Sequence, residues 1–270
     1  MGSPEAHFCG ASERADVASR STEQPDSVKD SPRQNRLLAA LPPDDIQRLL
    51  PALEPVPLPP GWTIHGAGTL EPYLYFVTSG IVSRFYVTES GASAGVALTG
   101  NEGVVGVASF LGGESTPTHA VVLIAGSSYR LPAAWLHHEF EHDGPLPRLL
   151  LRFTRALIVQ TAQIAVCNRH HTLHQRLCRW TLSCLDRLPS NELAMTQETI
   201  AEALGVRRES ITQAVGQLQD AGLIRCGRGR IDVIDRPRLE AEACECYGVI
   251  RREYDRLEAA ESAISTHRSE

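Results

Sequence analysis

The stretch from 195 to 235 constrains the fold more than any other part of the chain, because it carries the signals of two short helices in close succession. Thr196 is suited to cap a first helix, and Glu198 places a negative charge in its first turn, where the helix dipole favours one. Gly205 can adopt the left-handed conformation that ends such a helix. A second helix is expected from about Arg207, with a buried stripe at spacings of four and three residues that consists of Ile211, Val215 and Leu218.

A hairpin is expected directly after the second helix. Asp220, Ala221 and Gly222 are typical of a helix end, and two short apolar runs follow at 223–224 and 231–234. The residues between these runs read Cys-Gly-Arg-Gly-Arg, a glycine turn that carries arginines. Two helices followed by such a hairpin predict a winged helix-turn-helix, which places its second helix in the major groove of DNA.

The polar side chains of this unit are suited to reading bases. Arginine pairs with guanine O6 and N7, and glutamate accepts a hydrogen bond from cytosine N4. The alternative is a solvated helix face with an internal ion pair. The whole unit favours DNA binding, and we expect these residues to contact DNA: Thr196, Gln197, Arg207, Arg208, Glu209, Ser210, Thr212, Gln213, Arg228 and Arg230.

The distribution of charge supports this interpretation, although the net charge does not. The 270-residue chain has 26 basic and 32 acidic residues, and its net charge of −6 alone argues against nucleic-acid binding. Residues 145–236, however, contain 13 arginines and 8 acidic residues, whereas the remainder contains 13 basic and 24 acidic residues. A moderately basic part on an acidic body is expected when one face of the protein meets phosphate.

The sequence favours a cytoplasmic location. We expect no stretch long or apolar enough to span a membrane, and the N-terminus does not resemble a signal peptide. Seven cysteines lie scattered without the spacing of a zinc site, so reduced thiols are the simplest interpretation. Residues 1–34 are rich in Ser, Asp, Glu and Pro and are predicted to be a disordered tail.

The N-terminal half of the chain alternates apolar runs with glycines. After two short helical pieces within 35–52, the runs at 74–77, 81–87, 95–98 and 120–125 predict strands. Many short strands with regular turn signals indicate a β sandwich or roll. Four motifs stand out in this region: Pro59-Pro60-Gly61, Gly68, Tyr75-Phe76-Val77-Thr78-Ser79-Gly80 and Gly103-Val104-Val105-Gly106.

Together with the winged helix that follows them, these motifs resemble the catabolite activator (Crp/Fnr) family of transcription regulators over roughly residues 35 to 235. The resemblance implies a cyclic-nucleotide-binding-type β roll followed by a DNA-binding domain. In that family an Arg-Glu-Ser/Thr run places Arg on guanine and Glu on cytosine, and the run Arg208-Glu209-Ser210 matches it. Gln213 stands where relatives with the specificity of the catabolite activator have a further arginine, and Gln prefers adenine.

The chain departs from the cyclic-AMP binders of this family at the residues that hold the nucleotide. Those proteins carry a Glu for the ribose hydroxyl and an Arg for the cyclic phosphate. Here the aligned positions hold Val107 and Thr118-His119, and we expect His119 to be structural. Cys9 stands alone, which excludes the N-terminal four-cysteine iron–sulfur cluster of the oxygen-sensing branch.

A long helix is predicted between the two domains. Leu146, Leu150, Phe153, Leu157, Gln160, Ile164 and Cys167 recur at alternating spacings of four and three residues. This pattern is typical of a coiled-coil seam, and family members dimerise through a helix at this position. The alternative is a helix that packs on its own β roll. Since a single winged helix reads too short a site, we expect the homodimer.

Histidines and cysteines follow this helix. His170 and His174 have the i, i+4 spacing of a metal pair on one helical face, but a structural or hinge role is the expected one. The single residue between Cys244 and Cys246 suits neither a redox pair nor a zinc knuckle, so we interpret them as packing or free thiols. We therefore expect no metal and no cofactor. The tail from Leu239 to Glu258 is expected to be helical and to pack on the winged helix.

The sequence thus predicts an α+β chain with a β roll of jelly-roll type, a dimerisation helix and a winged helix-turn-helix. The expected division is 1–34 tail, 35–144 sensor domain, 145–175 dimerisation helix and hinge, 176–250 DNA-binding domain and 251–270 helical tail. The expected function is sequence-specific transcription regulation with double-stranded DNA, RNA polymerase and an unknown small-molecule effector as partners. The alternative is a small-molecule, haem or metal sensor with secondary DNA binding. No catalytic motif supports an enzyme.

Overall fold

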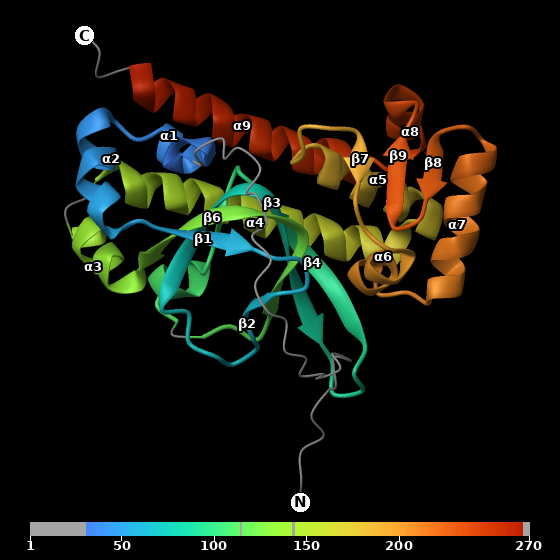
Figure 1. Ribbon diagram of the computed structural model, residues 1–270, viewed down its shortest axis with the longest axis horizontal. Coiled ribbons are helices and arrows are strands. Elements are labelled where there is room, and N and C mark those ends of the chain that lie inside the picture. The colour runs from blue at the N-terminus through green and yellow to red at the C-terminus, as the bar shows by residue number, and fades with distance from the viewer. Residues whose placement is uncertain (1–30, 114, 142–143, 267–270) are drawn as a thin grey trace, which may run out of the picture.

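The computed structural model describes residues 31–113, 115–141 and 144–266. Residues 1–30, which were predicted to be disordered, lie outside this range, as does Cys9, which was expected to stand alone. Residues 32–34, counted in that tail, form a short 3-10 helix, η1 (Pro32–Gln34), which Ser31 caps. Figure 1 shows a β roll in the middle of the molecule, a long helix α4 along one side of it, and a second long helix, α9, beside α4. The winged helix lies at one end.

Three short helical segments lead into the roll: α1 (Arg36–Ala39), α2 (Pro43–Leu49) and η2 (Leu50–Ala52). Asn35 caps α1, and its amide donates hydrogen bonds of 2.8 Å to the carbonyls of Val77 and Gly103. Because this buried side chain joins three segments far apart in sequence, it fixes the N-terminal helices against the roll.

The roll is one antiparallel six-stranded sheet that curls on itself. Its strands are β1 (Glu54–Leu58), β2 (Thr63–His65), β3 (Tyr73–Val87), β4 (Ser93–Thr99), β5 (Val104–Val105) and β6 (His119–Pro132). The order is β1-β6-β3-β4, with β2 paired to β6 and β5 to β3. Strands β3 and β6 bend at register shifts near Gly80, where φ is +81°. A Cβ on Gly126 would lie 2.0 Å from the Ser79 carbonyl oxygen, so this close crossing requires glycine.

Two helical segments complete this part of the chain. The 3-10 helix η3 (Val107–Phe110) lies between β5 and β6, and α3 (Ala133–Glu141) connects β6 to α4. All four predicted strands are present, but the runs at 74–77 and 81–87 form the single strand β3.

Helix α4 (Pro145–His170) carries the predicted apolar stripe, and that stripe is buried within one chain. Its leucines and Phe153 pack in one cluster with the N-terminal helices and the strands of the roll. Gln160 accepts a hydrogen bond of 2.7 Å from the Leu98 amide and donates one of 3.0 Å to the Tyr254 hydroxyl. These side chains are therefore not available to a second copy, and the contacts match the alternative of a helix packed on its own roll.

The expectation that no segment is long and apolar enough to span a membrane was wrong for α4. A window of this helix reaches a mean hydropathy of 1.3. Of that window, 44% is buried, because one side of the helix packs against the roll and α9. Length and composition alone did not distinguish this helix from a membrane span.

The DNA-binding domain starts after a two-residue break. Its elements are α5 (Leu173–Leu185), β7 (Glu192–Leu193), α6 (Gln197–Leu204), α7 (Arg208–Asp220), β8 (Ile224–Gly227), β9 (Arg230–Val233) and α8 (Arg236–Glu242). The strands pair in the order β7-β9-β8. One apolar core joins α5, α6 and α7 and extends to Ile81, Phe85 and Leu98 of the roll.

The last helix, α9 (Cys246–Thr266), lies along α4 (Figure 1). The C-terminal segment was expected to pack on the winged helix, and it does so in part: α8 packs against α5, and α9 contacts α5 while it covers α4. Tyr254 and Leu257 contribute to the same apolar cluster as the stripe of α4. Helix α9 also begins at Cys246, inside the range predicted for the DNA-binding domain.

Candidate DNA-binding surface and sensor site

The two helices of the predicted DNA-binding unit form where their local signals place them. The Thr196 hydroxyl accepts a hydrogen bond of 3.2 Å from the Thr199 amide and caps α6. Gly205 ends this helix in a left-handed conformation, with φ at +64°. Arg207 is the extended N-cap residue of α7. The stripe Ile211, Val215 and Leu218 is buried, which turns the opposite face of α7 to solvent.

The first turns of α7 present the side chains expected to read bases. Arg207, Arg208 and Glu209 are exposed, as are Thr212 and Gln213, whereas Ser210 is half-buried. The guanidinium Nε of Arg208 lies 3.7 Å from a carboxylate oxygen of Glu198 on α6, and the two side chains are 65% and 58% exposed. Because an ion pair this exposed contributes little stability, Arg208 can exchange this partner for a base at small cost.

Two predicted contact residues hold the helices to each other. The Thr212 hydroxyl donates a hydrogen bond of 2.7 Å to the Gln197 side-chain oxygen, which joins α7 to the first turn of α6. Thr196 is occupied as the cap of α6. These residues therefore orient the reading helix, and their neighbours Arg208 and Gln213 present side chains to solvent.

The wing lies beside this helix. Gly229 turns the β8–β9 hairpin with φ at +68°, and Arg228 at its tip is exposed. Among the described residues, no ion pair involves Arg228, whereas Arg230 lies 3.4 Å from Asp232 and 3.7 Å from Glu192. A hollow of about 260 Å³ separates wing from helix. Its lining includes Thr196, Gln197, Arg208 and Arg230, four of the residues predicted to contact DNA.

The roll has no charged pair at the positions that would hold a cyclic nucleotide. Val107 is buried at the start of η3, and Thr118 is buried with its hydroxyl 2.9 Å from that of Thr116. His119 is half-buried at the start of β6. These positions supply neither a carboxylate for a ribose hydroxyl nor a guanidinium for a phosphate.

A buried His65–Glu71 pair lies in the same part of the roll and was not identified from the sequence. Glu71 accepts a hydrogen bond of 3.0 Å from the Ala108 amide, and its other oxygen lies 3.3 Å from His65 Nε2. Burial, followed by the positive charge of Arg84, lowers the pKa of His65 to about 4. Burial also raises the pKa of Glu71. One oxygen of the Glu71 carboxylate thus already accepts a hydrogen bond from the backbone beside Val107.

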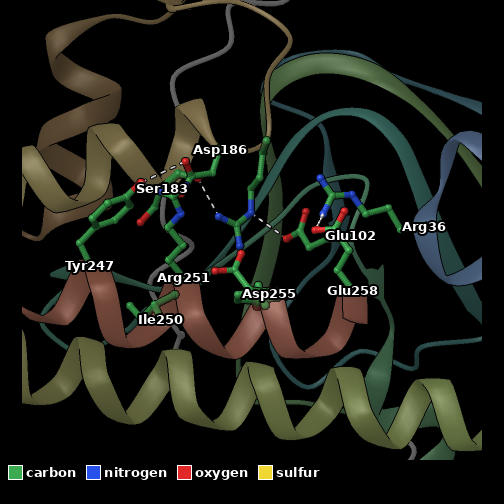
Figure 2. A pocket seen from close by; sticks show the side chains of 11 residues that line it. Arg36, Glu102, Ser183, Asp186, Tyr247, Ile250, Arg251, Asp255 and Glu258 are labelled. Atoms are coloured by element: carbon green, nitrogen blue, oxygen red, sulfur yellow. Dashed lines mark hydrogen bonds and ion pairs between the residues drawn. The ribbon is translucent and has the colours of Figure 1, made fainter. Parts of the chain in front are cut away.

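A second hollow, of about 170 Å³, lies where the roll, α5 and α9 meet (Figure 2). Arg187, just after the end of α5, donates a hydrogen bond of 2.7 Å to Glu102 of the roll, and Arg36 lies 3.1 Å from Glu258 of α9. Burial lowers the pKa of Arg187, but Glu102 more than offsets this and holds that pKa above its ordinary value. These two pairs link the roll to the segment after α5, and α1 to α9, so this hollow lies where the two domains and α9 are joined.

The predicted histidine pair does not share a helical face. His170 is the last residue of α4, whereas His174 lies in α5, beyond a break at His171 and Thr172. His174 Nε2 lies 3.2 Å from a carboxylate oxygen of Glu242 on α8. The i, i+4 spacing was therefore misleading, because it assumed one continuous helix.

Comparison with known proteins agrees with this architecture. Residues 55–143 match the cyclic nucleotide-binding domain, and residues 175–242 match the Crp-like helix-turn-helix domain. The chain belongs to the Crp/Fnr family. This Crp/Fnr protein is a DNA-binding transcription regulator with a sensor domain of the cyclic-nucleotide-binding type, as its sequence predicts.

Two curated relatives of this Crp/Fnr protein are global nitrogen regulators. The one from Synechococcus elongatus is 28% identical over 191 residues, which cover 67% of this chain and 86% of the relative. The one from Nostoc sp. is 28% identical over 181 residues, which cover 63% and 81%.

Solved structures share the fold. FixK2 from Bradyrhizobium japonicum has a TM-score of 0.63 at 21% identity, over 71% of this chain and 98% of that one. The c-di-GMP responsive global regulator CLP of Xanthomonas campestris has a TM-score of 0.58 at 18% identity, over 70% of this chain and 98% of that one. The order of the two domains in this Crp/Fnr protein is therefore that of known regulators.

Proposed function

We propose that this regulator acts as a homodimer that reads a palindromic DNA site with α7 and responds to an effector other than cyclic AMP. The main support for this proposal is that the exposed first turns of α7 and the arginine-bearing wing lie on one surface, on either side of one hollow. We further propose that this protein is not an enzyme, that it acts in the cytoplasm, and that it contacts RNA polymerase.

The exposed side chains of α7 define the expected half-site. Arg208 and Glu209 suit a G·C pair, because the guanidinium pairs with guanine and the carboxylate accepts from the cytosine on the opposite strand. Gln213 is exposed further along the same helix and favours a different base pair at the position beneath it. The two half-sites should be centred about 10–11 base pairs apart, one turn of the double helix.

The dimer interface is proposed on the face of α4 that this chain leaves uncovered. Leu151, Ile158 and Val166 are among the most exposed large apolar side chains of the described residues. Leu151 and Ile158 are one heptad apart, and Ala162 and Ala165 continue the same exposed row at spacings of four and three residues. This row has the period of a coiled-coil seam, which a second copy of α4 fits.

The interior of the roll supports an effector other than cyclic AMP. A cyclic phosphate needs a positive partner or converging amide donors. The side chains of Val107 and Thr118 carry no positive charge, and Glu71 already accepts a hydrogen bond from the Ala108 amide. Calorimetry with millimolar cyclic AMP should therefore show no site-specific heat, whereas a micromolar dissociation constant would contradict this part of the proposal.

Selection of bound duplexes from a random pool tests base reading. The wild type and Arg208→Ala are selected in parallel, with Arg252→Ala on the exposed side of α9 as a charge-matched control. Loss of the guanidinium should cost about 1–3 kcal/mol of binding and relax the choice at one guanine. The control should reproduce the wild-type profile. If Arg208→Ala retains the same guanine preference, Arg208 does not read a base.

A further inference from the structure

Four side chains with metal-binding atoms converge where α4 ends and α9 begins. Cys167 lies in the last turn of α4, His171 follows that helix, and Cys244 and Cys246 lie where α8 passes into α9. Their sulfur and ring nitrogen atoms all lie within 4.8 Å of one another. The Sγ atoms of Cys167 and Cys244 are 3.5 Å apart, and Cys246 Sγ is 3.4 Å from His171 Nδ1. The three cysteines are buried.

We propose that this Cys₃His cluster binds one tetrahedral metal ion, and that the ion is Zn²⁺. Three sulfurs and one imidazole form a donor set that zinc uses in closed structural sites. With bonds of about 2.3 Å to sulfur and about 2.0 Å to nitrogen, tetrahedral ligand atoms lie roughly 3.4–3.8 Å apart. The two contacts of 3.4 and 3.5 Å therefore need little adjustment to accept an ion.

The geometry favours a single ion over an iron–sulfur cluster. Such a cluster attaches its cysteines to two or more iron atoms, so the ligands surround a group of several atoms. Here all four ligand atoms lie within 4.8 Å of one another, which leaves room at their centre for one ion. The Cys167–Cys244 distance is also far longer than a disulfide bond, and these thiols are free.

The surroundings of His171 orient it as a ligand. Its Nδ1 faces Cys246, and its Nε2 lies 3.2 Å from a carboxylate oxygen of Glu245. A metal-bound histidine commonly donates its second ring nitrogen to a carboxylate, which fixes the tautomer and increases the basicity of the ligating nitrogen. Glu245 lies between the two cysteines of the Cys-Glu-Cys segment, so one short stretch supplies two ligands and the group that orients a third.

The cluster also explains a buried positive charge. Arg179 of α5 is 2% exposed, and its Nε donates a hydrogen bond of 3.2 Å to Cys167 Sγ. Within the described part of the chain, no carboxylate forms an ion pair with it. A buried guanidinium requires an anionic partner. Three thiolates around Zn²⁺ carry a net charge of −1, which Arg179 balances.

A second donor completes the outer contacts of the site. The Gln163 amide donates a hydrogen bond of 3.1 Å to Cys246 Sγ. Packing of free thiols, the expectation from sequence, accounts for the burial of these cysteines. It does not account for the two N–H donors directed at sulfur or for the orientation of His171. Bound zinc would tie the start of α9 to the end of α4 at the entrance to the DNA-binding domain.

Metal analysis of the intact protein tests this assignment. The full chain is purified under anaerobic conditions without a metal-affinity tag, and metals are measured by inductively coupled plasma mass spectrometry. About one zinc per chain is expected. After removal of zinc, Co²⁺ should restore a tetrahedral thiolate spectrum with sulfur-to-cobalt charge-transfer bands. Absence of bound metal together with absence of this spectrum would overturn the proposal.

Variants separate the site from adventitious binding. Cys246→Ser and His171→Asn should each lower zinc affinity at least about tenfold, as loss of a ligand or its support does. Cys226→Ser, a half-buried cysteine of the wing, should retain the metal. Three results would contradict a mononuclear zinc site. Both cluster variants could retain zinc, the wild type could contain iron with inorganic sulfide, or mass spectrometry of the wild type could detect a Cys167–Cys244 disulfide.

Alkylation of the wild type provides a measurement that does not depend on whether the variants fold. A thiol reagent should modify Cys167, Cys244 and Cys246 only after a chelator has removed the metal. Peptide mapping then shows which cysteines the ion protects. Equal modification of these three with and without the chelator would exclude them as ligands.

Discussion

Two arginine–glutamate ion pairs, one buried between the domains and one exposed on the DNA-binding domain, differ in what they can do. At the junction of roll and α5, Arg187 and Glu102 are 2.7 Å apart and only 5% and 8% exposed. On the proposed DNA-binding surface, Arg208 and Glu198 are 3.7 Å apart and 65% and 58% exposed. Glu102 also accepts from the Gly100 amide, so its carboxylate has several donors. The buried pair is committed to the fold, whereas the exposed pair remains available to a ligand.

The difference separates residues that hold the domains together from residues that bind a partner. A buried charge that loses its counterpart incurs a large desolvation cost, while an exposed charge is stabilised by water. Substitutions of similar size should therefore affect stability in one region and DNA affinity in the other. The following experiments test this distinction, starting with the largest effect.

Removal of the buried guanidinium should have the largest effect. Arg187→Met leaves Glu102 buried without its partner and should lower the free energy of unfolding by about 3–5 kcal/mol. Arg208→Met should change it by no more than about 1 kcal/mol. Urea denaturation followed by circular dichroism measures both. Equal stability of the two variants would show that burial does not distinguish these pairs.

Adjacent residues of α4 offer the same contrast for apolar side chains. Leu157 is 5% exposed and Ile158 is 63% exposed. Leu157→Asp should destabilise the fold by about 2–5 kcal/mol through lost packing, in addition to the cost of a buried charge. Ile158→Asp should keep the fold and shift sedimentation from dimer to monomer. A dimer that survives Ile158→Asp would place the interface elsewhere.

The arginine at the tip of the wing should have a smaller and less specific effect. Arg228→Ala should weaken binding to all duplexes alike and reduce the slope of log affinity against log salt by about one. Fluorescence anisotropy at several salt concentrations measures this slope. A change in base preference with an unchanged slope would instead assign Arg228 to base reading.

Titration of the buried pair in the roll should have the smallest effect. The pKa of His65 is about 4 in the folded protein against 6.5 ordinarily, so the unfolded chain takes up this proton first on acidification. Stability should therefore fall as the pH decreases from about 6.5 to about 4. His65→Gln should flatten this dependence, while the exposed control His170→Gln should retain it. Glu71, whose pKa is raised, acts in the opposite direction and remains in both variants.

The winged helix could be predicted from the sequence because its signals are local. Thr196 caps α6, Gly205 ends it, and the arginine-bearing turn lies between strands only a few residues apart. The polar side chains of this domain are also exposed, so the residues proposed to contact DNA are those that point away from the apolar stripe. The contact between Thr212 and Gln197 depends on how the helices pack and was not foreseen.

The other regions depend on partners that the local sequence does not specify. The stripe of α4 showed an amphipathic helix, but not whether a second copy or the roll and α9 cover it. His65 and Glu71 come together through pairing of distant strands. Cys167 and Cys244 are 77 positions apart, and no spacing rule within one segment joins them. Strand β1 was not predicted, because the prolines at 55 and 57 interrupt the usual strand pattern.

The contact between Gly95 and α6 has a mechanical consequence. A Cβ at Gly95 would lie 2.6 Å from the Ala203 carbonyl oxygen, so strand β4 of the roll lies directly against a helix of the DNA-binding domain. We therefore expect a ligand that displaces β4 to displace α6 as well, and with it α7 through Thr212 and Gln197. In the proposed dimer this movement changes the distance between the two reading helices. Binding to both half-sites then requires the two α7 helices to lie about 34 Å apart, one turn of B-DNA, so a ligand that changes this distance changes DNA affinity.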